Sequence, residues 1–379
     1  MRDNGSSSGK SAVILVTRGY AKKSGYYFRC QRDLQVLEAT GYVTTIVNVS
    51  EIGLGRALWS RRIFGEYRKR LVSSDLVLLE NYGALTFFWL DSLFRFGRQT
   101  KTVFVCHGSL EDLRSFRWYR LRRLVYSFAE NRMAKALSAV ACVSIVMMQD
   151  FERKYPRFEG KIVCTPNLPV PAFYREVERQ SQKLRSKLRM ELDLPNDKKL
   201  LIYVGNCQAW QNLGLLVSVC VAIQDESNEF YFVFLSQEIE NLQNMLDRAG
   251  VRASGYSLLT VENQQVPGYL VAADFLYVVR DQSEVNRVAC PTKAVEYLIS
   301  GTPVVISAEL GDVSKIVSES GRGIVVSRST TENPRLLATE ILNYSGTFGE
   351  RSAPSIAPLS KVSIFGERHN YDVFAGILK

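Results

Sequence analysis

The chain has 379 residues, of which 46% are hydrophobic, and a formal net charge of +10. This length predicts two domains, and this apolar content is enough for real cores, which argues against a disordered chain. The charge favours an anionic partner, so nucleic acid, a membrane surface and a phosphorylated substrate are candidates. The seven cysteines form no C-x-x-C pair and no His-Cys spacing, which argues against a zinc site and favours free thiols in a reducing compartment.

The first half of the chain alternates short apolar runs with helical stretches. Its N-terminus, MRDNGSSSGK, is polar and precedes a strand, so we expect no secretory signal. A first helix is expected over roughly residues 28–40. Short β-branched runs separated by helices indicate a parallel sheet. The expected strands are SAVILVT, YVTTIVNV, DLVLLE, TVFVC, LSAVACVS and KIVCTP.

A second series of the same kind follows a proline-rich and charged segment, near residues 166–195, where we place the domain linker. We expect a first domain at residues 1–170 and a second at residues 185–355, each an α/β Rossmann-like doubly wound fold, facing one another across a cleft. An uncharged run at residues 200–224 is interrupted by GNCQAWQN, so we expect no transmembrane helix. The expected strands of the second series are KLLIYVG, EFYFVFL, YSLLTV, ADFLYVV, TPVVIS and GIVV.

The stretch after ADFLYVV, at residues 280–305, carries the strongest functional signal. Arg280 follows a buried strand, where open parallel sheets bind ligands. A helix starting near Pro291 would place Thr292 and Lys293 in its first turn, beside free N–H groups that favour an anion. A lysine is unfavourable there for the helix dipole unless an anion is present. Arg280, Lys293 and this helix start therefore suit a diphosphate.

The same stretch, PTKAVEYLISGTPVV, resembles the donor-site signature of the family-four glycosyltransferases, which have the GT-B fold. Glu296 and the GTPVV run at residues 301–305 match that signature in type and spacing. The longer pattern R-x-x-S-x-V-N-R-V-x-x-P-x-K-x-x-E-Y-L resembles a bacterial polysaccharide branch of the family. The resemblance implies a retaining transferase that binds a UDP- or GDP-sugar on the second domain and the acceptor on the first. It also implies that a C-terminal helix, about residues 360–379, crosses back onto the first domain.

The chain departs from the family at the first turn of the second domain. The family has a glycine followed by an arginine, and a lysine some five residues later, which hold the diphosphate. Here Gly205 is followed by Asn206, and Gln211 occupies the lysine position. The N–H groups of Gly205 and Asn206 can still contact a phosphate, but they bring no charge. We expect Arg280 and Lys293 to compensate.

A second departure concerns the donor sugar. Glu296 corresponds to the family glutamate that meets the ribose, whereas Val288 stands where the family has its other glutamate. Asn286, Glu284 or backbone N–H groups of residues 288–290 are then candidates to hold sugar hydroxyls. For Glu284, a solvated surface charge is the alternative. Trp210 is a candidate to stack on a base or sugar, with core packing as its alternative.

The first half offers a histidine directly after the strand TVFVC. Enzymes of the resembled family often have a histidine there, so His107 would donate a hydrogen bond to the sugar or to the developing charge. Glu111 is a candidate to orient its imidazole or to bind an acceptor hydroxyl. A loop histidine with internal partners is the alternative.

The turn after the first strand, TRGYAKKSGYYFRC, resembles the family turn that touches the donor phosphates and the acceptor. Gly19 and Gly25 would permit close approach of the backbone, and Lys22, Lys23 and Arg29 would attract an anion. A flexible basic loop is the alternative.

Two segments, RALWSRRIFGEYRKRL and RSFRWYRLRRLVYSF, combine arginines with large apolar residues. In the second, Trp118, Leu121, Val125 and Phe128 have helical spacing, which suits a helix on an anionic membrane surface. Core-facing aromatics with solvated arginines are the alternative. A nucleic-acid partner would also suit such patches, but no nucleic-acid-binding motif accompanies them.

The sequence thus predicts a glycosyltransferase that moves a sugar from a nucleotide-diphosphate donor to a glycan or polyprenyl-linked glycan during surface polysaccharide biosynthesis. We expect it in the cytoplasm, with the inner face of the plasma membrane as a peripheral location. No metal is expected because no Asp-x-Asp clamp is evident, and no other cofactor is expected. Two alternatives stay open: a catalytically silent GT-B partner subunit, and a basic nucleic-acid-binding protein whose affinity would fall steeply with salt.

Overall fold

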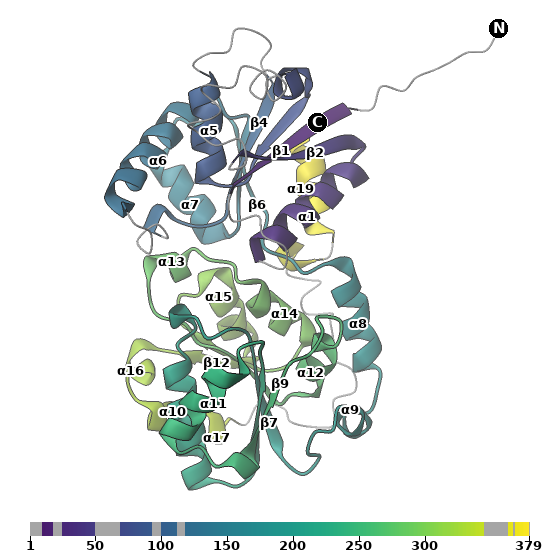
Figure 1. Cartoon of the computed structure of the whole chain (residues 1–379), viewed down its shortest axis with the longest axis vertical. Helices are drawn as coiled ribbons and strands as arrows, with labels where there is room; N and C mark the ends of the chain where they lie inside the picture. The colour runs from purple at the N-terminus through teal and green to yellow at the C-terminus, as the bar shows by residue number, and fades with distance from the viewer. Residues whose placement is uncertain are drawn as a thin grey trace, which may run out of the picture. The chain divides into compact units, whose positions relative to one another are not determined.

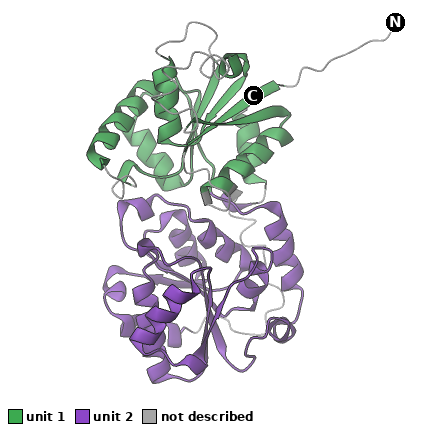
Figure 2. Ribbon diagram, in the orientation of Figure 1, with its two compact units in different colours: residues 1–166, 368–379 green, residues 167–367 purple. Residues whose placement is uncertain are grey.

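The structure is a computed structural model that describes residues 10–17, 25–49, 69–92, 100–111, 118–344, 363–366 and 368–378. The chain divides into two compact units (Figure 2). Unit 1 comprises residues 1–166 and 368–379, and unit 2 comprises residues 167–367. Each unit contains one six-stranded sheet in which every pairing is parallel, so the expected α/β fold class is confirmed.

The sheet of unit 1 has the order β2-β1-β3-β4-β5-β6. All six strands lie where the apolar runs predict them, because β-branched runs that are buried on both faces pack well in a parallel sheet. The strands are β1 (Lys10–Val16), β2 (Tyr42–Asn48), β3 (Leu76–Leu79), β4 (Lys101–Cys106), β5 (Ala139–Cys142) and β6 (Lys161–Cys164).

Helices cover both faces of this sheet (Figure 1). One face packs against α1 and the C-terminal helix α19, whose Phe374 and Ile377 join the core formed by residues such as Ile14 and Leu78. The other face carries α5, α6 and α7 (Figure 1). The helices are α1 (Gly25–Ala39), α5 (Tyr82–Ser92), α6 (Tyr119–Met133), α7 (Ile145–Lys154) and α19 (His369–Leu378).

The sheet of unit 2 has the order β12-β11-β10-β7-β8-β9. Its strands also lie at the six predicted apolar runs. They are β7 (Lys199–Val204), β8 (Phe230–Leu235), β9 (Tyr256–Leu259), β10 (Phe275–Val278), β11 (Val304–Ser307) and β12 (Gly323–Val326).

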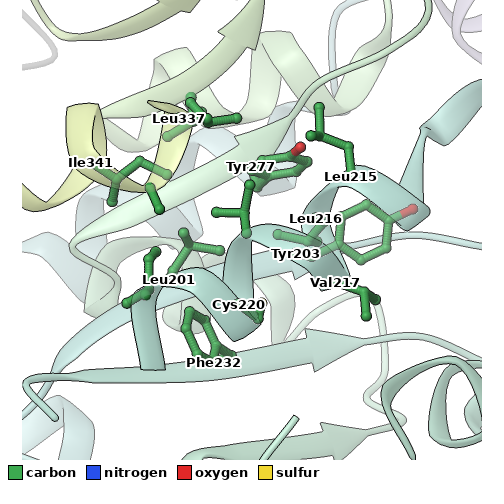
Figure 3. Packing of buried hydrophobic residues seen from close by; sticks show 14 of the residues in the cluster. Leu201, Tyr203, Leu215, Leu216, Val217, Cys220, Phe232, Tyr277, Leu337 and Ile341 are labelled. Carbon is green, nitrogen blue, oxygen red and sulfur yellow. The ribbon is translucent and has the colours of Figure 1, made fainter. Parts of the chain in front are cut away.

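Side chains from α10, α11 and α17 pack with strand residues into one large core, in which Tyr203 and Tyr277 are buried (Figure 3). Helix α12 contacts β7, helix α14 contacts β10, and the two helices contact each other. The α-helices of unit 2 are α8 (Pro171–Ser181), α9 (Arg185–Glu191), α10 (Leu213–Glu226), α11 (Ile239–Ala249), α12 (Val266–Ala272), α13 (Glu284–Arg287), α14 (Thr292–Ser300), α15 (Gly311–Ser320), α16 (Arg328–Thr331) and α17 (Pro334–Leu342). Its short 3-10 turns are η2 (Ala209–Gln211), η3 (Ala253–Gly255) and η4 (Ser363–Phe365).

The seven cysteines are free thiols. Four of them, in apolar runs at Cys106, Cys142, Cys164 and Cys220, are buried as the sequence predicts. Within the described part of the chain, every helix is too short or too polar to cross a bilayer.

Candidate donor site and its surroundings

The carboxyl ends of β7 and β10 lie side by side in unit 2. From β7 the chain runs to β8 and β9 on one side, and it then returns to β10 on the other side of β7. Such a reversal of strand order leaves a crevice at the carboxyl ends of the two strands, which is where doubly wound sheets bind ligands. Gly205 directly follows β7, and Arg280 lies two residues after β10.

Gly205 makes room for the ammonium group of Lys293. A β-carbon at Gly205 would lie 2.1 Å from Lys293 Nζ and 2.8 Å from the Tyr203 hydroxyl oxygen. Gly205 also has φ +153°, a backbone conformation that L side chains rarely adopt. Its N–H donates to the carbonyl of Leu235 at 2.9 Å, so the expected contact of this amide with a phosphate is wrong. The role of Gly205 is to leave space for the Lys293 ammonium, because glycine has no side chain.

Lys293 is the second residue of α14, which begins at Thr292 after an N-cap, Pro291, that supplies no side-chain cap. Its Nζ is buried, has no hydrogen-bond partner among the described residues, and lies 5.1 Å from the centroid of the Tyr203 ring. The pKa of Lys293 is lowered to about 7, mainly by burial and also by the nearby charge of Arg280, while Glu296 opposes the shift. A buried lysine without a partner at a helix N-terminus provides a ready site for an anion.

Arg280 is fixed by its backbone. Its N–H donates to Ser307 Oγ at 2.5 Å, and that hydroxyl donates to the Arg280 carbonyl at 2.8 Å. Its Nε is buried without a hydrogen-bond partner among the described residues, and Nη1 makes one long bond of 3.5 Å to Asn286 Oδ1. Burial lowers the pKa of Arg280, although the guanidinium remains charged at any ordinary pH. The sequence predicts that Arg280 and Lys293 belong to one site. In the structure both are near Tyr203: Arg280 interacts with it electrostatically, and the Lys293 ammonium lies over its ring.

Glu296 follows Lys293 by three residues, so both side chains lie on one face of α14. Burial raises the pKa of Glu296 to about 7, and Lys293 opposes the shift. The next residue, Tyr297, anchors the helix, because its hydroxyl accepts a hydrogen bond of 3.2 Å from the Val204 N–H at the end of β7. Helix α14 is thereby held against the strand that leads to Gly205.

The loop after Gly205 is closed by internal hydrogen bonds. The Tyr203 hydroxyl donates to the Asn206 carbonyl at 2.7 Å, and Gln211 Nε2 donates to Asn206 Oδ1 at 3.4 Å. Asn206 and Gln211 therefore contact each other. Trp210 is 49% exposed, so the packed-core alternative for this residue is wrong.

Sequence reasoning missed two residues of this site. The Tyr203 ring lies beneath the Lys293 ammonium, and Glu238 Oε2 accepts a hydrogen bond of 3.1 Å from the Cys207 N–H of the loop. Glu238 follows β8, which neighbours β7. Its position shortly after a predicted strand was the available signal, but a sequence alone does not show which neighbouring loop a carboxylate contacts.

Asn286 supports Arg280. It is 5% exposed, and its Nδ2 donates to the Asp281 carbonyl at 2.8 Å while its Oδ1 accepts from Arg280. Both polar atoms of its side chain are therefore engaged within this loop. Contact with a donor sugar stays a prediction for Asn286, and the same holds for Thr292 at the start of α14.

The other candidates for the sugar hydroxyls are used elsewhere. Glu284 forms an ion pair with Arg287, with 2.8 Å between its Oε2 and Arg287 Nε, which agrees with the surface alternative. The N–H groups of Val288 and Ala289 both donate to the Asn286 carbonyl. These two amides are therefore engaged within the loop, so the expectation is wrong for Val288 and Ala289 and stays a prediction for the N–H of Cys290.

In unit 1, His107 directly follows β4, and its Nε2 lies 2.6 Å from Oε2 of Glu80, which directly follows β3. Glu111, the expected partner of this imidazole, instead pairs with Arg123 at 3.0 Å. The expected partner is therefore wrong. Glu80 takes this position because β3 and β4 are neighbouring strands, so their carboxyl ends lie side by side. Burial lowers the pKa of His107 to about 3, helped by Arg29 and opposed by Asp33, so the imidazole is neutral at pH 7.

The expected anion-attracting residues of the N-terminal turn have different outcomes. Gly25 is the first residue of α1, whereas Gly19, Lys22 and Lys23 lie outside the described residues. Arg29 is 5% exposed and forms a 2.6 Å ion pair with Asp33. A guanidinium that is buried with an internal counterion does not attract a ligand from solvent, so that expectation is wrong for Arg29.

Helix α6 presents a basic and apolar surface. Ala129, Glu130 and Met133 are its buried residues, and most side chains between Tyr119 and Phe128 are exposed. Arg120, Arg122 and Arg123 are exposed along the same half. The α6 surface is defined here by its exposed apolar side chains, with the exposed fraction of each: Trp118 (68%), Leu121 (58%), Leu124 (69%), Val125 (40%) and Phe128 (48%).

Comparison with known proteins confirms the resemblance found in the sequence. Residues 185–343 match the family described as Glycosyl transferases group 1. The Escherichia coli (strain K12) protein WcaI, whose name assigns it as a glycosyl transferase to colanic acid biosynthesis, is 29% identical over 139 residues. That stretch covers 37% of this chain and 34% of WcaI, so the likeness spans about a third of the relative's length.

Solved structures show that the whole fold is shared. A glycosyltransferase from Rickettsia africae ESF-5 has a TM-score of 0.68 at 15% identity, covering 98% of this chain and 99% of that one. WaaG, a glycosyltransferase of lipopolysaccharide biosynthesis, has a TM-score of 0.64 at 16% identity, covering 97% and 99%. HepE of Anabaena in complex with UDP has a TM-score of 0.68 at 15% identity, covering 97% and 99%. The two Rossmann-like units are therefore those of a GT-B fold.

Proposed function

We propose that this chain, a GT-B protein whose residues 185–343 are a group 1 glycosyl transferase domain, transfers a sugar from a nucleotide-diphosphate donor. The acceptor is a glycan or a polyprenyl-linked glycan, and the product is a surface polysaccharide precursor. One observation carries the proposal: the Lys293 ammonium is buried against Gly205, without a hydrogen-bond partner among the described residues, where β7 and β10 end.

The charge at this place suits a diphosphate. Arg280 and Lys293 each bring a buried nitrogen that lacks a hydrogen-bond partner in the described structure. Two phosphate groups supply several acceptor oxygens and the negative charge that both cations lack. The same cations would stabilise the charge that develops on the leaving nucleotide, which is the usual role of preorganised donors in such reactions. They supply positive charge without a metal ion.

The other residues of the site have neutral or acidic side chains and take other roles. We assign Glu296 to the ribose hydroxyls, because a carboxylate on the Lys293 face of α14 is well placed to accept hydrogen bonds from a diol. Asn206 and Gln211 are assigned to positioning the loop. The resemblance to family four supports retention of the anomeric configuration. For the donor, UDP-sugars are favoured by likeness to HepE, whose structures contain UDP and UDP-glucose.

A silent partner subunit is the second candidate, and one contact favours it. Glu238 binds the Cys207 N–H in the loop that would approach the diphosphate. A carboxylate at that position repels an anion unless neighbouring cations outweigh it. Arg280 and Lys293 are the cations that must do so, and donor titration therefore separates the two candidates.

We also propose that the protein works in the cytoplasm, at the inner face of the plasma membrane. The α6 surface supports this location, because large apolar side chains next to exposed arginines suit an interface with anionic lipid. A polyprenyl-linked acceptor would be present at the same interface.

The proposal is tested by incubating the purified protein with UDP-, GDP- and CMP-sugars and a lipid-linked glycan fraction, and by measuring released nucleotide. We expect release with a UDP- or GDP-sugar, and a loss of roughly 100-fold or more in Lys293→Met, because one preorganised donor is worth about 3–4 kcal/mol in the transition state. Lys315→Met is the matched control, since Lys315 is an exposed lysine on the neighbouring helix α15. No nucleotide release, together with no donor binding in a titration, would favour the silent partner subunit.

A further inference from the structure

The chain passes from unit 1 to unit 2 between Pro166 and Asn167. The peptide that joins these residues is held by side chains of unit 1. A carbonyl oxygen has two lone pairs, yet that of Pro166 accepts from three donors, two of them charged. These contacts, called the Pro166 clamp below, come from Arg29 Nη1, Arg32 Nη2 and Asn370 Nδ2, each at 3.1 Å.

The Pro166 clamp is built from buried side chains. Arg29 and Arg32 on α1 are each 5% exposed, and Asn370 on α19 is 1% exposed. The Asp33 carboxyl orients Arg29 at 2.6 Å, and Arg29 also donates to the Thr165 carbonyl at 2.7 Å and to Thr165 Oγ1 at 3.0 Å. Breaking such contacts is costly, because buried partners that separate stay unsatisfied. The last peptide of unit 1 is therefore fixed to both helices.

The residue that follows the clamp makes a hydrogen bond within unit 2. Asn167 Nδ2 donates to the Cys290 carbonyl at 2.8 Å. Cys290 is 4% exposed and directly precedes Pro291, the N-cap of α14. An anchor to unit 1 and an anchor to unit 2 are therefore adjacent along the chain, at the Pro166 carbonyl and at the Asn167 side chain.

The chain returns to unit 1 after residue 367, and this second crossing is also anchored on both sides. Before the return, the Phe365 carbonyl accepts from the Tyr174 hydroxyl at 3.0 Å, within unit 2. After the return, His369 Nε2 lies 3.0 Å from the Cys164 carbonyl oxygen, which can only accept, so this nitrogen carries a hydrogen. Asn370 comes next and belongs to the Pro166 clamp. The start of α19 therefore holds the segment in which the first crossing begins.

We propose that the Pro166 clamp places the hinge of the first crossing at Asn167, so that the two units turn relative to one another about the bonds of this residue. A peptide is planar, and only the bonds on either side of each α-carbon rotate easily. Because the Pro166 carbonyl is fixed, the first such bond after the clamp is the N–Cα bond of Asn167. Arg29, Arg32 and Asn370 are positioning residues, because they act through the backbone that they hold.

The hinge also has a path to the donor site, and this part of the inference rests on the proposed function. Asn167 binds the loop that leads into α14, and Lys293 is the second residue of that helix. A diphosphate held by Lys293 displaces the start of α14, and the bond from Asn167 to the Cys290 carbonyl carries the displacement to the hinge. Asn167 thereby links donor binding to the relative orientation of the units.

The first test measures the motion of the units without any ligand. Spin labels are attached to a keto amino acid placed at Lys135 in unit 1 and Lys315 in unit 2, both exposed, and pulsed electron resonance gives their distance distribution. Arg32→Met/Asn370→Leu removes two of the three clamp contacts. We expect a distribution roughly twofold broader than in wild type, because a hinge of one residue then extends into the preceding segment.

Lys161→Met is the matched control, since it removes a contact of 2.6 Å between β6 and the Gly376 carbonyl of α19 that lies outside the clamp. Its distribution should keep the wild-type width. If the double variant fails to fold, Arg32→Met and Asn370→Leu are measured singly, and each should broaden the distribution by a smaller amount. An unchanged width in every clamp variant that folds would overturn the proposal.

The second test adds UDP to the labelled proteins and follows binding by calorimetry. We expect UDP to shift the mean distance in wild type, and Asn167→Ala to bind UDP with loss of most of that shift. Bound UDP that leaves the wild-type distance unchanged, or shifts both proteins equally, would overturn the link to the donor site. Absence of UDP binding to wild type would contradict the proposed function instead, and the first test would still decide the position of the hinge.

Discussion

The ammonium nitrogen of Lys293 lies 5.1 Å from the centroid of the Tyr203 ring and has no hydrogen-bond partner among the described residues. The ring face attracts a cation, and burial strengthens this attraction, but it does not replace the hydrogen bonds that water would give. The free protein therefore holds a lysine whose charge is not fully compensated. An anion that binds this nitrogen compensates its charge. Donor binding should therefore favour the protonated form of Lys293.

Gly205→Ala should abolish donor binding, because the new methyl group would lie 2.1 Å from Lys293 Nζ and force the lysine out of place. The positive φ of Gly205 adds strain, so we also expect destabilisation of about 1–3 kcal/mol. Gly376→Ala is the control, since a β-carbon there meets no atom within 4 Å and alanine suits the helix α19. Calorimetric titration with UDP would check both variants, and unchanged affinity in Gly205→Ala would contradict the assigned site.

Lys293→Met should make the free protein more stable near neutral pH. The pKa of Lys293 falls from 10.5 to about 7 on folding, so the unfolded chain binds more protons between these values. Wild-type stability should therefore rise with pH from about 7 to 10.5, and the full penalty applies below pH 7. Allowing for the partial exposure of the side chain, methionine should stabilise by about 1–3 kcal/mol at pH 6.5 and by less at pH 9.5.

Urea unfolding of both proteins at pH 6.5 and pH 9.5 measures this difference. The loss of Lys293 also removes the cation that opposes the raised pKa of Glu296, so Lys293→Met/Glu296→Gln isolates the lysine effect. A stability difference that does not change between the two pH values would show that Lys293 has an ordinary pKa in the folded protein.

Leu124→Glu should weaken binding to vesicles that contain anionic lipid. Leu124 is 69% exposed on α6, and a lost apolar contact together with an added negative charge should reduce the bound fraction by roughly tenfold, or about 1.4 kcal/mol. Met190→Glu is the matched control, because Met190 is 70% exposed but lies on α9 of unit 2. Cosedimentation with vesicles of anionic and of neutral lipid makes the comparison. Equal losses in both variants would argue against the α6 surface as the membrane contact.

The sequence predicts the fold well because each element is encoded locally. The twelve strands are short β-branched or aromatic runs, and helix α14 begins after Pro291 as its proline and position predict. Arg280 and Lys293 could also be found, since both flank one loop after a buried strand. Their spacing along the chain is short enough for the site to be visible in a single stretch.

The rest of the site depends on contacts between distant parts of the chain. Glu80 and His107 follow two separate strands, and the pairing of β3 with β4 brings them together. Glu111 was the expected partner of His107 because it is near in sequence, whereas Glu80 is near in space. The same reason explains Glu238, whose contact with Cys207 follows from the pairing of β7 with β8.

The most direct test of the donor site is calorimetric titration of UDP at pH 8, in two buffers that differ in ionisation enthalpy, with wild type, Lys293→Met and Lys315→Met. At this pH Lys293 is mostly neutral in the free protein, because its pKa is about 7, and a bound diphosphate should return it to the charged form. We predict that wild type and Lys315→Met take up close to one proton on binding, and that Lys293→Met takes up none and binds roughly 10–100-fold more weakly, because a hydrogen bond to a charged group is worth about 1.5–3 kcal/mol. Equal affinity and equal proton uptake in all three proteins would contradict a diphosphate contact by Lys293.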